Sequence, residues 1–338
     1  MRSIAIVGAG VIGLSTAQVI LEDFPDIHVT IYSSEFSPNT TGDISAGFVK
    51  PFFLGANVEE KDVIRWTKTT MDHLFTIAKE DSELSTGVSL LSGYSFFKDS
   101  PPFISNIIKE CFIQPRLVSQ EEIKNLVHGK YLGALFASTL TCACDVYLPY
   151  IMKKLKSKGV KFVQEKIFSL NTLAERGHDI VVNCCGFGAQ ELTGDQSLQP
   201  VRGQVIEVYA PWIKHFFNEE DGDVYVLPRI DNVIVGGTHT KETSLEVDKP
   251  TSKMIFERAC KMIPSLKHGK IVAERVGLRP SRPTIRMEAE TAITKSGKEY
   301  IVLHHYGHGG SGVTMHWGCA KQASDVLQKF LYKKSSKL

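Results

Sequence analysis

Residues 274–283 (ERVGLRPSRP) bring three arginines and two prolines together late in the chain. Each proline fixes its own φ angle and pushes the residue before it toward an extended conformation, so this segment is not a helix interior. The guanidinium of Arg279 or Arg282 is a planar donor that can bind a carboxylate through two parallel hydrogen bonds. The segment is therefore a candidate carboxylate site, and the alternative is a pair of solvated surface arginines.

A second candidate site lies near the N-terminus, where Gly8, Gly10 and Gly13 form a G-x-G-x-x-G pattern directly after apolar residues 4–7. Between a strand and a helix, these glycines allow a tight turn, close approach of a pyrophosphate and close helix–strand packing. The N–H groups and the positive dipole end of that helix stabilise phosphate charge. The pattern predicts an adenine-dinucleotide site, and the alternative is a purely structural glycine turn.

The acidic residue that binds the ribose in such sites is expected about 20 residues beyond the glycines. A second strand is expected over residues 27–34, and Ser34 stands at that spacing, with Glu35 directly after it. Successive side chains of a strand point to opposite faces, so this offset of one residue departs from the usual pattern. We predict that Ser34 binds the ribose and that Glu35 reaches it from the end of the strand.

A third candidate lies near the C-terminus, where a flexible glycine loop is predicted to precede a helix that begins near Gly312. A helix N-terminus at this place would stabilise negative charge on a bound cofactor. The same segment contains four histidines, which raise the alternative of a metal site: His304, His305, His308 and His316. No carboxylate lies within residues 301–318, and glycines interrupt the ligand geometry, so we predict no metal.

The composition favours a small-molecule ligand. The 338 residues carry 39 Lys and Arg against 37 Asp and Glu, a net charge of +2, so we expect no nucleic-acid and no membrane partner. Residues 4–21 contain no charge, but their glycines favour a strand, a turn and a helix over a membrane span. The seven cysteines lack disulfide or zinc spacing, so we expect reduced thiols in an intracellular protein.

Both helices and strands are needed to position the candidate sites described above. Helical periodicity covers residues 59–80, and a helix followed by a strand is expected within 146–167. Other apolar or alternating runs predict strands: a pair within 87–97, one over 180–184 ending at Gly186 and Gly188, and mainly antiparallel strands over 201–212 and 223–238. The pattern predicts an α/β fold in which a Rossmann-like domain is interleaved with a smaller, mainly antiparallel β-sheet domain.

Four stretches of this chain resemble the D-amino acid oxidase family: VGAGVIGLSTA (7–17), NCCGFGAQEL with LQPVRGQ (183–204), VGLRPSRP (276–283) and HHYGHGGSGVTMHWG (304–318). Within that family the chain is most similar to the D-aspartate oxidases, through HLFTIA (73–78), YLPY (147–150) and the doublet His304-His305. The resemblance implies an FAD-binding domain over 1–50, 145–195 and 275–332, and a substrate-binding domain over 51–144 and 196–274. Residues 333–338 would form a tail.

The resemblance also implies roles for individual residues. Arg279 matches the arginine that clamps the substrate α-carboxylate, Tyr225 the tyrosine that assists it, and Gly310 the glycine whose carbonyl accepts from the substrate amine. The FAD-binding positions that it implies are Gly8, Gly10, Val11, Ile12, Gly13, Ser34, Glu35, Asp43, Ser45, Ala46, Gly47, Lys166, Ile167, Cys185, Gly186, Gly307, Gly309, Gly310, Gly312, Val313 and Thr314.

The reaction implied by the resemblance is the oxidation of a D-amino acid by hydride transfer to FAD. The imino acid that forms is hydrolysed by water to a 2-oxo acid and ammonia, and molecular oxygen reoxidises the flavin to yield hydrogen peroxide. The protein's own contribution would be orientation and electrostatics.

The residue that would bind a distal carboxylate is not evident from the sequence. D-aspartate oxidases use two arginines, and the matching positions here hold Asn218 and His239. A buried carboxylate requires a partner, so His239, Lys50, Lys241 and Ser311 are considered for the substrate side chain. We expect an oxidase of acidic D-amino acids. The alternatives are an oxidase of neutral D-amino acids, with Phe52, Ser311 and Tyr225 around the side chain, and a flavin- or NAD-binding protein without turnover.

The last three residues are Ser336, Lys337 and Leu338, an S-K-L sequence that is typical of a peroxisomal address. We therefore expect a peroxisomal import receptor as a partner and the peroxisomal matrix as the compartment. An enzyme that releases peroxide is suited to that compartment.

Overall fold

The computed structural model describes residues 2–220 and 224–335, so the predicted address at Ser336–Leu338 lies outside the described residues and stays a prediction. The chain begins with β1 (Ser3–Val7), α1 (Val11–Asp23) and β2 (His28–Ser33). β1 and β2 are parallel, with Ile4 paired with Val29. The predicted strand, glycine turn and helix are therefore confirmed, and no helix among the described residues is long and apolar enough to span a membrane.

A parallel half of the sheet surrounds β1. It has the order β13–β7–β1–β2–β6, with β13 over Glu299–His308, β7 over Ile180–Asn183 and β6 over Lys161–Gln164. Because side chains alternate between faces, Ile4 and Ile6 pack into one core cluster, while Ala5 and Val7 pack into another on the opposite face. Both faces of this half are therefore buried, as expected for parallel strands.

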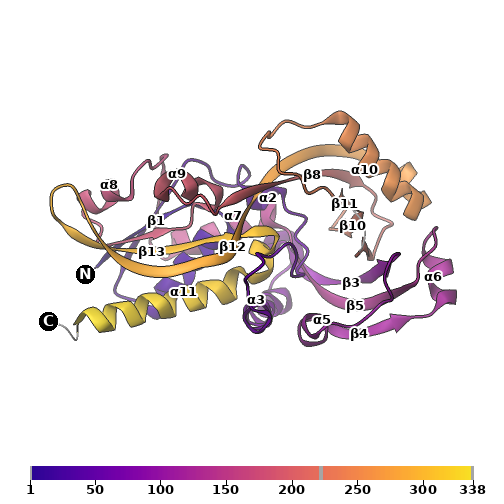
Figure 1. Cartoon of the computed structure of the whole chain (residues 1–338), viewed down its shortest axis with the longest axis horizontal. Coiled ribbons are helices and arrows are strands. Elements are labelled where there is room, and N and C mark those ends of the chain that lie inside the picture. Colours follow the sequence, from indigo (N-terminus) through magenta and orange to yellow (C-terminus); the bar gives the residue numbers. More distant parts are fainter. Residues whose placement is uncertain (1, 221–223, 336–338) are drawn as a thin grey trace.

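Helices cover the first of these faces. α11 (Gly312–Ser335) packs against α1 and against α3 (Glu60–Glu80), and α7 (Cys144–Ser157) packs on the other side of α1. Figure 1 shows α11 running along one side of this half of the sheet. The predicted helices at 59–80 and near Gly312 are confirmed, as is the helix followed by a strand within 146–167.

The other half of the sheet is mainly antiparallel, as predicted. Its strands are β4 (Ile113–Val118), β5 (Gly133–Cys142), β3 (Val88–Phe97), β9 (Phe216–Glu219), β10 (Tyr225–Pro228), β11 (Asn232–Gly236) and β8 (Gln199–Tyr209). α10 (Lys249–Met262) packs on β8 and β11 and closes a core that contains Ile206, Val235 and Ile255. The strand pair predicted within 87–97 is wrong, because β3 is a single strand between β5 and β9.

One long strand joins the two halves. β12 (Lys270–Ile293) pairs with β8 over its first part and with β13 over its last part, so 13 strands of the described residues form one continuous sheet. Figure 1 shows β12 and β8 extending from one half of the molecule into the other. The expected α/β fold is confirmed, whereas the antiparallel strands do not form a separate sheet. The domain limits given above stay a prediction.

Short elements complete the chain between these strands. The predicted flexible loop before α11 is much shorter than expected, because β13 continues through Gly307 to His308 and a single 3-10 turn follows. The remaining helices and 3-10 turns are α2 (Thr41–Ile44), α4 (Glu83–Thr86), α5 (Asn106–Cys111), α6 (Gln120–Leu126), α8 (Leu170–Glu175), α9 (Ala189–Thr193), Gly186–Gly188, Pro264–His268 and Gly309–Ser311.

Candidate active site

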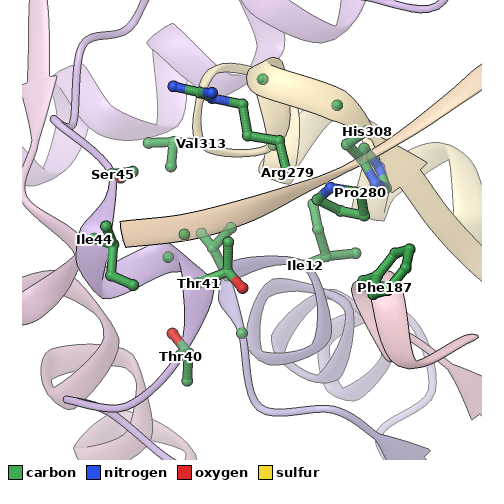
Figure 2. Close-up of a pocket in the computed structure, with 18 of the residues that line it drawn as sticks. Ile12, Thr40, Thr41, Ile44, Ser45, Phe187, Arg279, Pro280, His308 and Val313 are labelled. Carbon is green, nitrogen blue, oxygen red and sulfur yellow. The ribbon is translucent and has the colours of Figure 1, made fainter. Parts of the chain in front are cut away.

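A cavity of about 430 Å³ lies where the two halves of the sheet meet. Its wall includes the turn before α1, the end of β2, the segment around α2, the turn after β7, the middle of β12 and the turn before α11. Figure 2 shows Ile12, Thr41, Arg279 and Phe187 around this space, each from a different segment. Parallel strands end at this edge of the sheet, which is the usual place for a ligand in such folds.

The turn before α1 is held so that its backbone faces the cavity. Gly8 has φ +107, and a Cβ there would lie 2.4 Å from the Cys184 carbonyl oxygen. A Cβ at Gly13 would lie 2.0 Å from the Gly8 carbonyl oxygen, whereas one at Gly10 would meet no atom within 4 Å. Gly8 and Gly13 are therefore needed for packing, and Gly10 keeps open the space in front of the helix N-terminus.

The polar residues at the end of β2 lie beside this turn. Ser33, Ser34 and Glu35 all line the cavity, and the Ser33 hydroxyl accepts a hydrogen bond from Ala9 N–H at 3.3 Å. The same hydroxyl donates to the Glu35 carbonyl at 2.6 Å. The offset acidic residue therefore still reaches the cavity wall, because the chain turns directly after β2.

The second helix N-terminus also faces the cavity. Gly310, Gly312 and Val313 line it, and no acidic residue occupies the first turn of α11. His308 lines it too, and burial lowers the pKa of His308 to about 3, so its ring is neutral. The cavity thus receives two helix N-termini, from α1 and α11, each of which favours negative charge.

Arg279 lies on β12 and lines the cavity. Among the residues that the structure describes it forms no salt bridge, and its Nη1 donates to the Thr238 carbonyl oxygen at 3.3 Å. A Cβ at Gly203, on the neighbouring strand β8, would lie 2.4 Å from each of the Arg279 Nη atoms. The guanidinium therefore rests on the bare backbone of Gly203, with its charge available to a ligand.

Tyr225 lies beside Arg279. Its ring rests on Gly236, where a Cβ would lie 2.3 Å from the Tyr225 hydroxyl oxygen. Burial raises the pKa of Tyr225, and the neighbouring Arg279 guanidinium opposes that shift. The phenol is therefore a protonated hydrogen-bond donor at neutral pH, next to the Arg279 guanidinium.

Arg282 has a different role from Arg279. Its Nε donates to Asp195 at 2.8 Å, and the Tyr306 hydroxyl donates to the same carboxylate oxygen at 3.0 Å. Burial opposes ionisation of Asp195, but the hydrogen bonds from Ser197, Arg282 and Tyr306 lower the pKa of this carboxyl well below its usual range. Of the two arginines considered as carboxylate ligands, Arg279 and Arg282, only Arg279 faces the cavity with its charge unpaired by a carboxylate of the described chain.

A family model described as FAD dependent oxidoreductase matches residues 3–326. The chain is 37% identical to the D-aspartate oxidase of Homo sapiens over 335 residues, which are 97% of this chain and 95% of that protein. It is 34% identical over 340 residues to D-aspartate oxidase 1 of Caenorhabditis elegans, with 99% of each chain covered. It belongs to the FAD-dependent oxidoreductase family.

Other relatives and the fold agree with this assignment. The chain is 33% identical over 336 residues to a D-amino acid oxidase of Dugesia ryukyuensis, with 98% of each chain covered. Glycine oxidase from Geobacillus kaustophilus has a similar structure, with a TM-score of 0.77, 15% identity and coverage of 97% of this chain and 95% of that chain. The predicted resemblance to the D-amino acid oxidase family is confirmed, and so is FAD as the cofactor.

The residues around the cavity fit FAD. The open space at Gly10 and the N–H groups at the start of α1 suit a pyrophosphate, and Glu35, which lines the cavity, offers an acceptor for a ribose hydroxyl. The start of α11 suits the end of the cofactor that becomes negatively charged on reduction. The predicted FAD-binding residues that line the cavity are Gly8, Gly10, Val11, Ile12, Ser34, Glu35, Ser45, Ala46, Gly47, Cys185, Gly186, Gly307, Gly309, Gly310, Gly312 and Val313.

Several predicted cofactor residues lie outside the cavity wall. Lys166 is exposed and forms a salt bridge with Glu191 at 3.0 Å, and Ile167 is buried in the core behind β7. Asp43 caps α2 by accepting from the Thr40 N–H at 2.8 Å. Gly13 packs on the turn, and the Thr314 hydroxyl donates to the Lys50 carbonyl at 2.9 Å. These residues shape the wall or lie behind it rather than lining it.

The residues considered for binding the substrate side chain also divide into those that line the cavity and those that do not. Lys50 and Asn218 line the cavity together with Arg279, Tyr225 and Gly310. Ser311 does not, because its hydroxyl accepts from Phe52 N–H and donates to the Phe52 carbonyl, each at 2.7 Å.

His239 and Lys241 also fall outside the cavity wall. His239 stacks on Phe53 with a ring-centroid separation of 5.2 Å, and Lys241 is exposed. None of Ser311, His239 and Lys241 lines the cavity, and the direct roles considered for them stay predictions.

The histidine-rich segment contributes a buried polar cluster. His305, His308 and Cys319 bring their ligand-type atoms within 4.8 Å of one another. His305 Nδ1 is 2.9 Å from the Thr16 hydroxyl, which links β13 to α1, and burial lowers the pKa of His305. These contacts tie the two cofactor-facing segments together, and the absence of a metal stays a prediction.

Some cavity residues were not predicted from the sequence. The segment around α2 had a usable signal, because Thr40-x-x-Asp43 is a capping box that marks a helix start. No local sequence pattern indicates Phe187 or Gly203 as a cavity residue, because their approach to the cavity depends on strand pairing. The unpredicted lining residues include Ala9, Ser33, Asn39, Thr40, Thr41, Gly42, Ile44, Phe48, Phe187, Gly203, Val205, Gly277, Pro280, Tyr306 and His308.

Substitutions of Gly10 and Gly13 are predicted to have different effects, one on cofactor binding and the other on the stability of the apoprotein. Gly10→Ala should weaken FAD binding about tenfold or more without lowering the melting temperature of the apoprotein, because its methyl group would enter open space. Gly13→Ala should lower that melting temperature, because its Cβ would lie 2.0 Å from a backbone oxygen. Flavin fluorescence titration and thermal unfolding of both apoproteins would check this. Equal melting temperatures for the two variants would contradict it.

Proposed function

We propose that this protein is an FAD-dependent oxidase that deaminates acidic D-amino acids, with D-aspartate as its preferred substrate. The observation that carries the proposal is Arg279, a cation in the cofactor cavity with a phenol beside it and no carboxylate partner in the described chain. A substrate α-carboxylate would complete this pair through two parallel hydrogen bonds. The D-aspartate oxidases among the relatives support the acidic substrate.

In the proposed reaction the chain's residues orient the substrate. Arg279 and Tyr225 hold the α-carboxylate, and the Gly310 carbonyl accepts a hydrogen bond from the amine, so the substrate is fixed at two points. FAD, when bound, supplies the acceptor for the two electrons and passes them to molecular oxygen, which gives hydrogen peroxide. Water then hydrolyses the imino acid to the 2-oxo acid and ammonia. The fixed carboxylate and amine leave only one enantiomer with its Cα–H toward the cofactor.

The proposed localisation rests on the last three residues of the sequence. The proposal places the enzyme in the peroxisomal matrix, imported through a receptor for Ser336–Leu338. An enzyme that releases peroxide is suited to that compartment. The support is the S-K-L sequence itself.

The test is anaerobic mixing of the FAD-loaded protein with D-aspartate, D-alanine and L-aspartate separately. We expect D-aspartate to bleach the flavin absorbance at least tenfold faster than D-alanine, and L-aspartate to have no effect. Faster bleaching by D-alanine would establish the neutral-substrate alternative instead. No bleaching by any D-amino acid would contradict the oxidase proposal and favour a flavoprotein without turnover.

A further inference from the structure

Lys50 provides a second cation on the wall of the cavity. Its side chain is only 13% exposed, and it forms a salt bridge with Glu220. Lys50 lines the cavity, whereas Glu220 does not. The carboxylate of Glu220 therefore contacts the ammonium group without lining the cavity itself.

The backbone on each side of this pair is anchored. The Lys50 carbonyl accepts from the Thr314 hydroxyl at 2.9 Å, which attaches it to the first turn of α11. Glu220 N–H donates to the Phe96 carbonyl at 2.9 Å, which attaches Glu220 to β3. The Lys50–Glu220 pair thus joins the cofactor-facing helix to the antiparallel half of the sheet, and its position is set by both.

Asn218 connects the Lys50–Glu220 pair to the Arg279–Tyr225 clamp. Its Nδ2 donates to the same Glu220 oxygen that Lys50 contacts, at 3.0 Å. Asn218 on β9 is also paired directly with Tyr225 on β10, so the two side chains are neighbours on one face of the sheet. The Lys50 ammonium group and the Arg279 guanidinium therefore lie on one wall of the cavity, linked through Asn218 and Tyr225.

We propose that Lys50 binds the distal carboxylate of the substrate. Glu220, fixed by Asn218, positions Lys50 and weakens the electrostatic attraction between Lys50 and that carboxylate. This inference rests on the proposed function, because it assigns one end of the same substrate. An ammonium with three donors can contact Glu220 and a ligand carboxylate together. The buried distal charge then has a partner although neither Asn218 nor His239 is a permanent cation.

The experiment compares an acidic ligand with its neutral isostere in Lys50→Met, Glu220→Gln and the double variant. The measured quantity is the ratio of kcat/KM for D-aspartate to kcat/KM for D-asparagine. Lys50→Met should lower this ratio at least tenfold, and Glu220→Gln should raise it about threefold to tenfold. The double variant should lower it less than Lys50→Met, because no buried carboxylate is left unpaired.

A binding measurement separates this inference from the proposed reaction. Succinate and succinamate differ only in distal charge, and their dissociation constants can be measured from the change in the flavin spectrum without turnover. In Lys50→Met the dissociation constant of succinate should rise relative to that of succinamate, even if no D-amino acid is oxidised. The exposed pair Lys68–Glu110, 49% and 46% exposed, gives the matched control Lys68→Met/Glu110→Gln, which should not change either ratio. Equal ratios in the wild type and Lys50→Met would overturn the assignment.

Discussion

Replacing Arg279 with methionine is expected to lower kcat/KM for D-aspartate about 10³-fold while FAD remains bound. A substrate carboxylate that loses its buried cation costs about 3–5 kcal/mol, and about 1.4 kcal/mol corresponds to a factor of ten. Arg279 has no carboxylate partner in the described chain, so its removal leaves no protein charge unpaired. The loss should therefore appear in the reaction and not in the free energy of unfolding.

Anaerobic flavin reduction, followed over a range of D-aspartate concentrations, would measure this loss. Arg279→Lys keeps the charge but not the planar fork, so it should recover only part of the rate. Gly203→Ala is a second variant, because its Cβ would displace the guanidinium, the movable end of the Arg279 side chain, from 2.4 Å. It should lower kcat/KM about tenfold or more and leave the melting temperature close to that of the wild type. Wild-type reduction rates in Arg279→Met would refute the clamp.

A marked loss of stability in mild acid is the second large effect that we expect. Burial lowers the pKa of His73 to about 3, of His308 to about 3 and of His316 to about 4, so all three are neutral in the folded protein. In the unfolded chain a histidine titrates near pH 6.5. The unfolded state therefore binds more protons below that pH, and the free energy of unfolding falls as the pH falls from about 7 toward 4.

The size of this loss follows from the same linkage. Each of the three histidines should contribute a loss of about 1.4 kcal/mol between pH 7.5 and 5.5, or about 4 kcal/mol together. Urea unfolding of the apoprotein at these two pH values would measure it. His73→Gln should reduce the pH dependence, since it removes one of the three groups, whereas substitution of the exposed His268 should not. Equal stabilities at pH 7.5 and 5.5 would contradict the prediction.

The local patterns in the sequence predicted the elements that hold the cofactor. Gly8, Gly10 and Gly13 are spaced for one turn, so the strand, the turn and the helix could be derived without distant contacts. Prolines 280 and 283 correctly placed Arg279 in an extended segment. These features depend on neighbouring residues alone, and the structure agrees with them.

Features that depend on distant pairing could not be derived. Lys50 and Glu220 are 170 residues apart, and nothing local indicates that they meet. The continuity of the sheet depends on β12 pairing with two strands from opposite halves, and periodicity gives no partner for a strand. The hydrogen bonds between the Ser311 hydroxyl and the Phe52 backbone likewise join residues that are far apart in the sequence.

The long strand β12 has a mechanical consequence. Arg279 is held by the ladder with β8, and the same strand continues into the ladder with β13, whose end carries the glycines of the cofactor cavity. A hinge between the two halves would have to break these ladders, so the clamp and the cofactor cradle move as one rigid body. Hydrogen exchange of the β12 amides should therefore stay slow throughout turnover.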